Sequence, residues 1–170
     1  SSAYDLPTQI LLGQLGPLRE PGTRRALLVG YGSGVTAGAL LTHPLDRLDL
    51  TEVSAGVLEA APWFAGLAGQ PLADPRLALH QEDARGYMQR SGGQWDLIVS
   101  EPSNPWMGGV ADLFSAEFYA ACRAHLAPRG QMVQWLQTYE TDDETLRMVL
   151  RAFRTAFPQG EAWQGLGTDL

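Results

Sequence analysis

The sequence predicts an α/β protein with a doubly wound, mostly parallel sheet and helices on both of its faces. Short apolar runs alternate with longer stretches of helical periodicity, and a glycine-rich turn directly follows the first apolar run. At 170 residues and 45% hydrophobic composition, the chain can bury one substantial core. We therefore expect a single domain over residues 1–170.

The first strands and helices flank the glycines. Residues 26–29, Ala-Leu-Leu-Val, predict a short buried strand, and 35–42 predict an apolar helix that ends before His43-Pro44. The second strand is expected at 48–53, where apolar and polar residues alternate, and the second helix at 55–66. Pro71 and Pro75 then mark a connection rather than a domain boundary.

The second half of the chain repeats this alternation. Strands are expected at 76–80, 95–99 and 131–136, and helices at 84–90, 115–126 and 142–156. Strands joined by helices of this length imply right-handed crossovers. The sheet should therefore be parallel.

Charge and composition exclude several classes of protein. The net charge is −7, and basic residues do not cluster beyond Arg24-Arg25, which argues against nucleic-acid binding. Cys122, the single cysteine, excludes an internal disulfide, and its alanine-rich surroundings predict a buried helix position. The three histidines are scattered without ligand spacing, so we expect no metal site.

The uncharged run from Ala26 to Leu45 is the one segment that raises the question of a membrane span. Glycines, a proline and a histidine interrupt it, and it divides into strand, loop and helix. We therefore expect this domain to lie outside the membrane, in the cytoplasm. The start at Ser1 without methionine and the end at Leu170 predict a fragment of a longer polypeptide.

The turn Gly30-Tyr31-Gly32-Ser33-Gly34 predicts a nucleoside-binding site. Its glycines let the backbone turn sharply beneath a ligand, at the carboxyl end of a parallel strand, where open α/β sheets bind ligands. A dinucleotide fingerprint, G-x-G-x-x-G, would need a glycine in place of Val35. The G-x-G-x-G spacing is instead similar to motif I of proteins that bind S-adenosylmethionine or its relatives, which predicts a Rossmann-like sheet of the methyltransferase type.

An acidic residue, Glu52, follows the second predicted strand. A carboxylate about 20 positions after the first glycine can accept hydrogen bonds from both ribose hydroxyls, as it does in dinucleotide folds. The alternative is a surface loop whose glutamate is merely solvated.

The fourth predicted strand runs directly into a loop with two prolines, Glu101-Pro102-Ser103-Asn104-Pro105-Trp106. This loop should face the glycine turn across the carboxyl edge of the sheet. The prolines fix its shape before a ligand binds. If burial raises the pKa of Glu101 toward neutrality, this residue can act as the general base for an attacking amine.

These motifs in series resemble the catalytic domain of spermidine synthases, the polyamine aminopropyltransferases. The matching segments are V-G-Y-G-S-G, L-D-L-T-E-V-S, Q-E-D-A-R-G-Y-M, W-D-L-I-V-S-E-P-S-N-P-W and D-L-F-S-A-E-F-Y. More narrowly, the chain resembles bacterial spermidine synthase-like proteins whose soluble domain often follows a membrane region. The resemblance extends from about Thr8 to Phe157.

The resemblance implies a reaction and its participants. The donor would be decarboxylated S-adenosylmethionine, the acceptor a small-molecule amine or polyamine, and methylthioadenosine a product, with no metal involved. By the same resemblance, we expect this chain to be a fragment that lacks the small β-domain preceding the family's catalytic domain and the final strands. If the chain belongs to the narrower group, its parent protein would include a membrane anchor. A homodimer is a further possibility that the sequence leaves open.

The resemblance also assigns roles to single residues. Glu52 would hold the ribose hydroxyls, and Asp83 would lie near the adenine amino group beside the backbone amide of Ala84. The glycines of the turn would form the floor of the pocket, and Gln9 falls where the family has a polar residue that contacts substrate. Asp83 also suits a helix N-cap, and both roles can coexist because a carboxylate has two oxygens.

The chain departs from the family in the loop after the fourth strand. The family's D-S-S-D-P stretch corresponds to Glu101 and Asn104, our two predicted catalytic residues. The glutamate keeps a basic carboxylate one methylene further out, and the asparagine offers an amide oxygen instead of an anion. Asn104-Pro105-Trp106 is also similar to the asparagine-proline-aromatic motif of amino methyltransferases, in which the ring, here Trp106, packs on the substrate nitrogen. A purely structural turn is the alternative.

Three functions therefore stay open. The first is an aminopropyltransferase-like enzyme that uses decarboxylated S-adenosylmethionine. The second is a methyltransferase that uses S-adenosylmethionine itself. The third is a catalytically silent nucleoside-binding or interaction domain.

Overall fold

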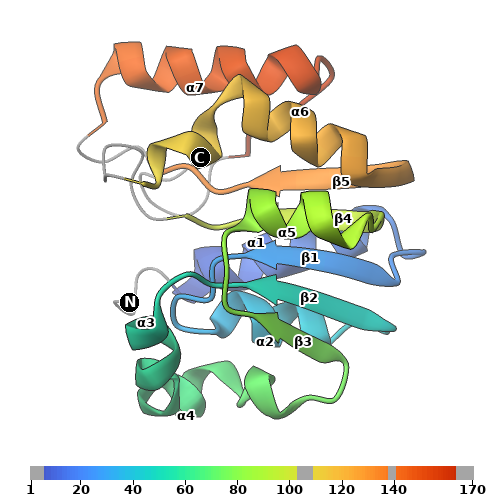
Figure 1. Cartoon of the computed structure of the whole chain (residues 1–170), viewed down its shortest axis with the longest axis vertical. Coiled ribbons are helices and arrows are strands. Elements are labelled where there is room, and N and C mark those ends of the chain that lie inside the picture. Colours follow the sequence, from blue (N-terminus) through green and yellow to red (C-terminus); the bar gives the residue numbers. More distant parts are fainter. Residues whose placement is uncertain (1–5, 103–108, 138–140, 164–170) are drawn as a thin grey trace.

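The computed structural model describes residues 6–102, 109–137 and 141–163 (Figure 1). Its strands are β1 (Arg25–Val29), β2 (Arg47–Thr51), β3 (Leu77–His80), β4 (Trp95–Ser100) and β5 (Leu126–Gln134). Its α-helices are α1 (Leu6–Arg19), α2 (Val35–Leu41), α3 (Ala55–Ala60), α4 (Ala65–Ala68), α5 (Ala84–Ser91), α6 (Ala116–His125) and α7 (Asp143–Ala156). Short 3₁₀ turns occupy Ala61–Phe64, Pro71–Ala73 and Ala111–Phe114.

The strands form one parallel sheet in the order β3-β2-β1-β4-β5 (Figure 1). The chain moves outward from β1 to β3 and then returns to place β4 on the other side of β1. Val29 at the end of β1 pairs with Ser100 at the end of β4, so the loops that follow these two strands are neighbours. In sheets of this kind the ligand crevice lies where the strand order reverses. The predicted doubly wound α/β fold is confirmed.

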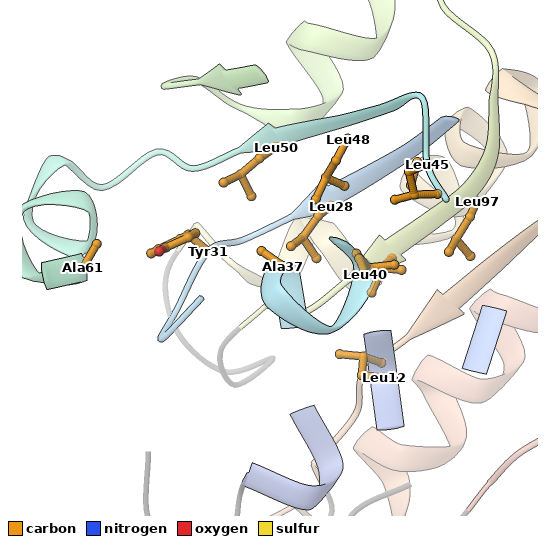
Figure 2. Close-up of a cluster of buried hydrophobic side chains, with 12 residues drawn as sticks. Leu12, Leu28, Tyr31, Ala37, Leu40, Leu45, Leu48, Leu50, Ala61 and Leu97 are labelled. Atoms are coloured by element: carbon orange, nitrogen blue, oxygen red, sulfur yellow. The ribbon is translucent and has the colours of Figure 1, made fainter. Parts of the chain in front are cut away.

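Apolar side chains fill both faces of the sheet because residues alternate along each strand. Leu28 of β1 packs with Leu40 of α2 and Leu12 of α1, in the cluster that Figure 2 shows. Its neighbour Leu27 belongs to a second cluster on the opposite face, with Phe118 of α6 and side chains from α5. Helices therefore cover both faces.

Helix α1 is absent from the elements predicted from the sequence. It contains Gly13, Gly16 and Pro17, residues that disfavour a helix interior. Packing explains the glycines: a Cβ atom at Gly13 would lie 2.7 Å from the Cβ of Ala39 in α2, and one at Gly16 would lie 2.5 Å from a methyl group of Leu97. These glycines allow α1 to lie close against α2 and the sheet.

Two other predicted elements differ in extent. The helix expected at 55–66 is divided into α3, a 3₁₀ turn and α4, because Pro62 interrupts the backbone hydrogen bonding. Strand β5 begins at Leu126 rather than 131, and its pairing with β4 shifts register between Trp95 and Leu97. Arg129, with a φ of 68°, lies within this irregular stretch.

Two smaller expectations concern Cys122 and the membrane. Cys122 is fully buried in α6, and burial raises the pKa of its thiol to about 12, as suits a core residue. In the part of the chain that the structure describes, no helix combines the length and the apolar character needed to cross a membrane.

Candidate functional site

The glycine turn after β1 adopts backbone conformations that explain its composition. Gly30, Gly32 and Gly34 have φ angles of 93°, 52° and 80°. A Cβ atom at Gly30 would lie 2.8 Å from the backbone oxygen of Glu101, so this glycine allows the turn to approach the loop after β4. Apart from its two chain neighbours, no described residue has an atom within 4 Å of the position that a Cβ of Gly32 would take. The backbone at Gly32 is therefore open to a ligand.

Glu52 supports this turn directly. Its side chain is 9% exposed, and its two oxygens accept hydrogen bonds from the backbone N–H groups of Tyr31, at 2.9 Å, and of Ser54, at 2.8 Å. The carboxylate therefore joins the loops after β1 and β2. Each oxygen keeps further lone-pair capacity for a ligand hydroxyl.

Asp83 is the N-cap of α5. Its carboxylate accepts a hydrogen bond of 2.8 Å from the backbone N–H of Gly86, and Ala84 behind it is buried. Asp83 itself is exposed, so its second oxygen remains available. The capping role is thus present in the structure, and the adenine-binding role stays a prediction.

Glu101 occupies the carboxyl end of β4 and is held by a residue from α1. The side-chain amide of Gln9 donates a hydrogen bond of 3.3 Å to its carboxylate. The Ser33 hydroxyl donates to Gln9 Oε1 at 3.1 Å, and the Thr36 hydroxyl donates to the Gln9 backbone oxygen at 3.1 Å, which fixes the orientation of Gln9. Burial raises the pKa of Glu101 to about 7, although the hydrogen bond from Gln9 acts in the opposite direction.

A cavity of about 540 Å³ lies beside these residues. This volume is within the usual range for small-molecule sites, about 300–1,000 Å³. The residues that line it come from α1, the glycine turn, the α3 region and the loops after β4 and β5: Gln9, Gly32, Ser33, Ser54, Gly56, Val57, Ala60, Phe64, Glu101, Trp135 and Gln137. The fold therefore places Gln9, Gly32 and Glu101, three of the predicted site residues, at one cavity.

Several predicted residues do not line this cavity. Glu52, Asp83 and Ala84 lie at the same edge of the sheet, after β2 and β3, but outside the lining. Gly30 and Gly34 act through the backbone of the turn. Asn104 and Trp106 lie outside the described residues. Across 6–102, 109–137 and 141–163, no three metal-ligating side chains gather into a group.

Sequence reasoning missed the aromatic and amide part of the cavity. Trp135 lines the cavity and, together with Gln134, also a separate groove between α1, β5 and α7. Phe64 and Gln137 were not singled out, because a phenylalanine beside Pro62 and a glutamine after a strand carry no motif.

A buried polar cluster lies around Asp49 in the middle of β2. Its carboxylate, 1% exposed, accepts hydrogen bonds from the Trp95 indole at 2.9 Å and the Arg47 guanidinium at 2.8 Å, and His80 lies 3.1 Å away. Burial alone would raise the pKa of Asp49, but these hydrogen bonds outweigh it and lower the pKa. The cluster connects β2 to His80 at the end of β3 and to Trp95 at the start of β4.

The parallel sheet, its strand order and the glycine turn define a Rossmann-like domain of the class shared with S-adenosylmethionine-dependent methyltransferases. Within this class the chain belongs to the spermine/spermidine synthase family, because the family model of the spermine/spermidine synthase domain matches residues 7–164.

Curated relatives agree with this family. The polyamine aminopropyltransferase of Nitrosomonas europaea is 33% identical over 136 residues, which cover 79% of this chain and 42% of the relative. The spermidine synthase of Dictyostelium discoideum is 27% identical over 143 residues, which cover 84% of this chain and 50% of the relative. The chain thus spans about half the length of the curated relatives it matches.

Solved structures share the fold. The spermidine synthase of Thermotoga maritima gives a TM-score of 0.80 at 24% identity, with 91% of this chain and 52% of that chain covered. A spermidine synthase in complex with the transition state analogue AdoDATO gives 0.83 at 24% identity, with 91% and 53% covered. Human methyltransferase-like protein 13, in complex with SAH, gives 0.68 at 23% identity, with 89% and 72% covered.

Proposed function

We propose that this chain is the catalytic domain of an aminopropyltransferase-like enzyme that uses decarboxylated S-adenosylmethionine as donor and an amine as acceptor. The observation that carries the proposal is the position of Glu101. Its carboxyl lines the cavity next to the glycine turn, at the reversal of strand order, and burial raises its pKa to about 7. Membership of the spermine/spermidine synthase family supports the choice of substrates.

The donor would lie across the carboxyl ends of β1, β2 and β3. The open backbone at Gly32 gives it a floor, and the remaining lone pairs of Glu52 suit the two ribose hydroxyls. Asp83 and the backbone of Ala84 would hold the adenine. The aminopropyl end would then point toward the cavity that Gln9 and Glu101 line.

Glu101 supplies the proton acceptor for the transfer. An amine attacks as its neutral form, so its nitrogen must lose a proton before or during attack. The nitrogen bonds to the aminopropyl carbon that the sulfonium holds, the carbon–sulfur bond breaks, and methylthioadenosine leaves with the electron pair. The carboxylate of Glu101 takes the proton, and a pKa near the working pH suits that role.

The product that remains after the donor has reacted distinguishes the candidate functions. Full-length protein would be incubated with decarboxylated or intact S-adenosylmethionine and a panel of amines, and methylthioadenosine and S-adenosylhomocysteine would be quantified. Methylthioadenosine that forms only with the decarboxylated donor and an amine is the expected result. If the intact donor gave S-adenosylhomocysteine, the protein would be a methyltransferase instead. If neither product formed, it would be a silent nucleoside-binding or interaction domain.

The partners and location proposed with this function follow the family resemblance. The partner is a small-molecule amine, and a second copy of the chain is proposed as a homodimer partner, which sedimentation of the full-length protein would test. We expect the reaction in the cytoplasm, which cell fractionation would check.

A further inference from the structure

His80, the last residue of β3, joins the two loops that carry the predicted nucleoside contacts. Its backbone oxygen accepts a hydrogen bond of 3.1 Å from the N–H of Glu52, which follows β2, and one of 2.9 Å from the N–H of Glu82, in the loop after β3. Asp83 comes directly after Glu82. One carbonyl group thus connects the backbone at the predicted ribose contact, Glu52, with the backbone next to the predicted adenine contact, Asp83.

The side chain of His80 is held by two contacts. Its Nε2 atom lies 3.1 Å from a carboxylate oxygen of Asp49, and its ring stacks on that of Tyr87 in α5, with 4.0 Å between the ring centroids and 27° between the ring planes. Burial acts to raise the pKa of Asp49, but the hydrogen bonds that it accepts outweigh this effect and lower the pKa. Asp49 is therefore ionised at neutral pH and accepts the hydrogen of Nε2. These contacts fix His80 relative to both β2 and α5.

The two predicted nucleoside contacts differ in what holds them. The Glu52 carboxylate accepts hydrogen bonds from two backbone N–H groups in the loops after β1 and β2, so it is fixed without the His80 side chain. Asp83 caps α5 through Gly86, a bond within the helix itself that does not attach the helix to the sheet. The packing of Tyr87 on His80 joins the first turn of α5 to the end of β3.

We infer that His80 is a positioning residue for the nucleoside: its ring sets the place of α5 and its backbone oxygen the place of the preceding loop, so that Asp83 meets the adenine of a nucleoside whose ribose Glu52 holds. The inference rests on the proposed function, which assigns these two contacts. Both contacts must form in one pose for tight binding, and a displacement of about 1 Å can remove one of them. His80 acts on the ligand through Asp83.

Three nucleosides report the two contacts separately. Full-length protein would be titrated by calorimetry with methylthioadenosine, with methylthioinosine, which has an oxygen in place of the 6-amino group, and with 2′-deoxymethylthioadenosine, which lacks a ribose hydroxyl. The affinity ratio of the first to the second measures the adenine contact, and that of the first to the third measures the ribose contact. Both ratios describe the folded protein, so a loss of stability by itself does not change them.

His80→Ala removes the ring and its bond to Asp49. We expect the adenine ratio to fall about tenfold, as for one lost hydrogen bond to a charged group, and the ribose ratio to stay within about twofold, because Glu52 keeps its own partners. Tyr87→Leu removes the stacked pair from the side of α5 and should lower the adenine ratio by a similar factor. The double variant should lose no more than either single one, since both changes break the same contact.

His125→Ala is the matched control. This histidine is also half-buried and lies near an aromatic ring, that of Trp95, with 6.1 Å between the ring centroids. It belongs to α6, and its Nδ1 atom lies 2.9 Å from the backbone oxygen of Ala121 in the same helix. Both affinity ratios should therefore stay as in the unmodified protein.

The outcomes are distinct. An unchanged adenine ratio in His80→Ala would overturn the inference, and so would an equal fall in both ratios or additive losses in the double variant. If the unmodified protein did not prefer methylthioadenosine to methylthioinosine, the adenine role of Asp83 and this inference would both be wrong, whereas aminopropyl transfer would still be judged by its own product assay. The expected ratios in a protein that forms no methylthioadenosine from the decarboxylated donor would support the positioning role and reject the proposed reaction.

Discussion

Gln9 in helix α1 donates a hydrogen bond of 3.3 Å to the carboxylate of Glu101, a residue 92 positions further along the chain. Ser33 of the glycine turn donates in turn to Gln9. Three separate segments thus converge on one carboxyl group.

Replacing Glu101 with glutamine should remove the proton acceptor while preserving size. We expect the transfer rate to fall by about two to four orders of magnitude, with methylthioadenosine affinity nearly unchanged. Single-turnover kinetics and calorimetry on full-length protein would measure both. Glu117→Gln, an exposed change in α6, is the matched control. A Glu101→Gln enzyme as fast as the original would exclude this residue as the base.

The transfer rate should depend on pH through Glu101. The carboxylate is the active form, so activity should rise as pH increases through about 7 and level off above it. A profile of kcat/KM against pH, which reports groups of the free enzyme, would show this rise. The Gln9→Met variant removes a hydrogen bond to the carboxylate and should move the rise to higher pH. A profile that shows no ionisation within about one pH unit of neutrality would contradict the assignment of Glu101 as the base.

Protein stability should change with pH in the opposite sense. Because the pKa of Glu101 is raised from 4.5 to about 7 on folding, its contribution to stability is fully present below 4.5 and is lost as pH rises through about 7. The loss amounts to about 3 kcal/mol at 1.36 kcal/mol per pKa unit. The unfolding free energy of Glu101→Gln minus that of the original protein should therefore be larger at pH 8 than at pH 4. Urea unfolding at the two pH values would measure this change.

Glu52 should be required for both nucleoside binding and loop structure. Glu52→Ala removes a charged acceptor from the ribose, which we expect to cost about 1.5–3 kcal/mol of methylthioadenosine affinity. It also leaves the backbone N–H groups of Tyr31 and Ser54 without their partner, so the unfolding free energy should fall by about 1–3 kcal/mol. Calorimetry and urea unfolding separate the two effects. Unchanged affinity would show that Glu52 supports the loops alone.

Gly30 should tolerate no side chain. Gly30→Ala combines a φ of 93° with a Cβ atom 2.8 Å from the Glu101 backbone oxygen, and should destabilise the protein by more than about 2 kcal/mol. Gly92→Ala has a φ of 56° but open space around the added atom, so it reports conformational strain alone, about 1 kcal/mol. If urea unfolding gave equal losses of unfolding free energy for the two variants, the close approach of Gly30 to the Glu101 backbone would add no cost of its own.

Local patterns in the sequence predicted every strand and every helix except α1, although the helix at 55–66 and strand β5 differ in extent. The strands were predicted because each apolar run is short and bounded by turn residues, and the helices because polar and apolar residues recur at helical spacing. Helix α1 was missed because Gly13, Gly16 and Pro17 disfavour helices in isolation. Close packing against Ala39 and Leu97 outweighs that disfavour, and such contacts between distant segments leave no periodic pattern.

The candidate site was predicted where a motif occurs and missed where only the tertiary arrangement counts. The glycines and Glu101 come directly after strands, so their place at the carboxyl edge could be deduced. The partners of Glu52 could not, because the Tyr31 and Ser54 amides are backbone groups that every sequence contains. Phe64 and Gln137 reach the cavity from segments that have no signature of their own.

The placement of Gln9 on α1 has a consequence for control of the reaction. The hydrogen bond from Gln9 favours the ionised form of Glu101 and so lowers the pKa of the carboxyl. If α1 moved away from the sheet, this hydrogen bond would be lost and the carboxyl would become less buried, two changes that act on its pKa in opposite directions. The protonation state of Glu101 is therefore coupled to the position of the first helix, whose residue Gln9 precedes it by 92 positions in the chain.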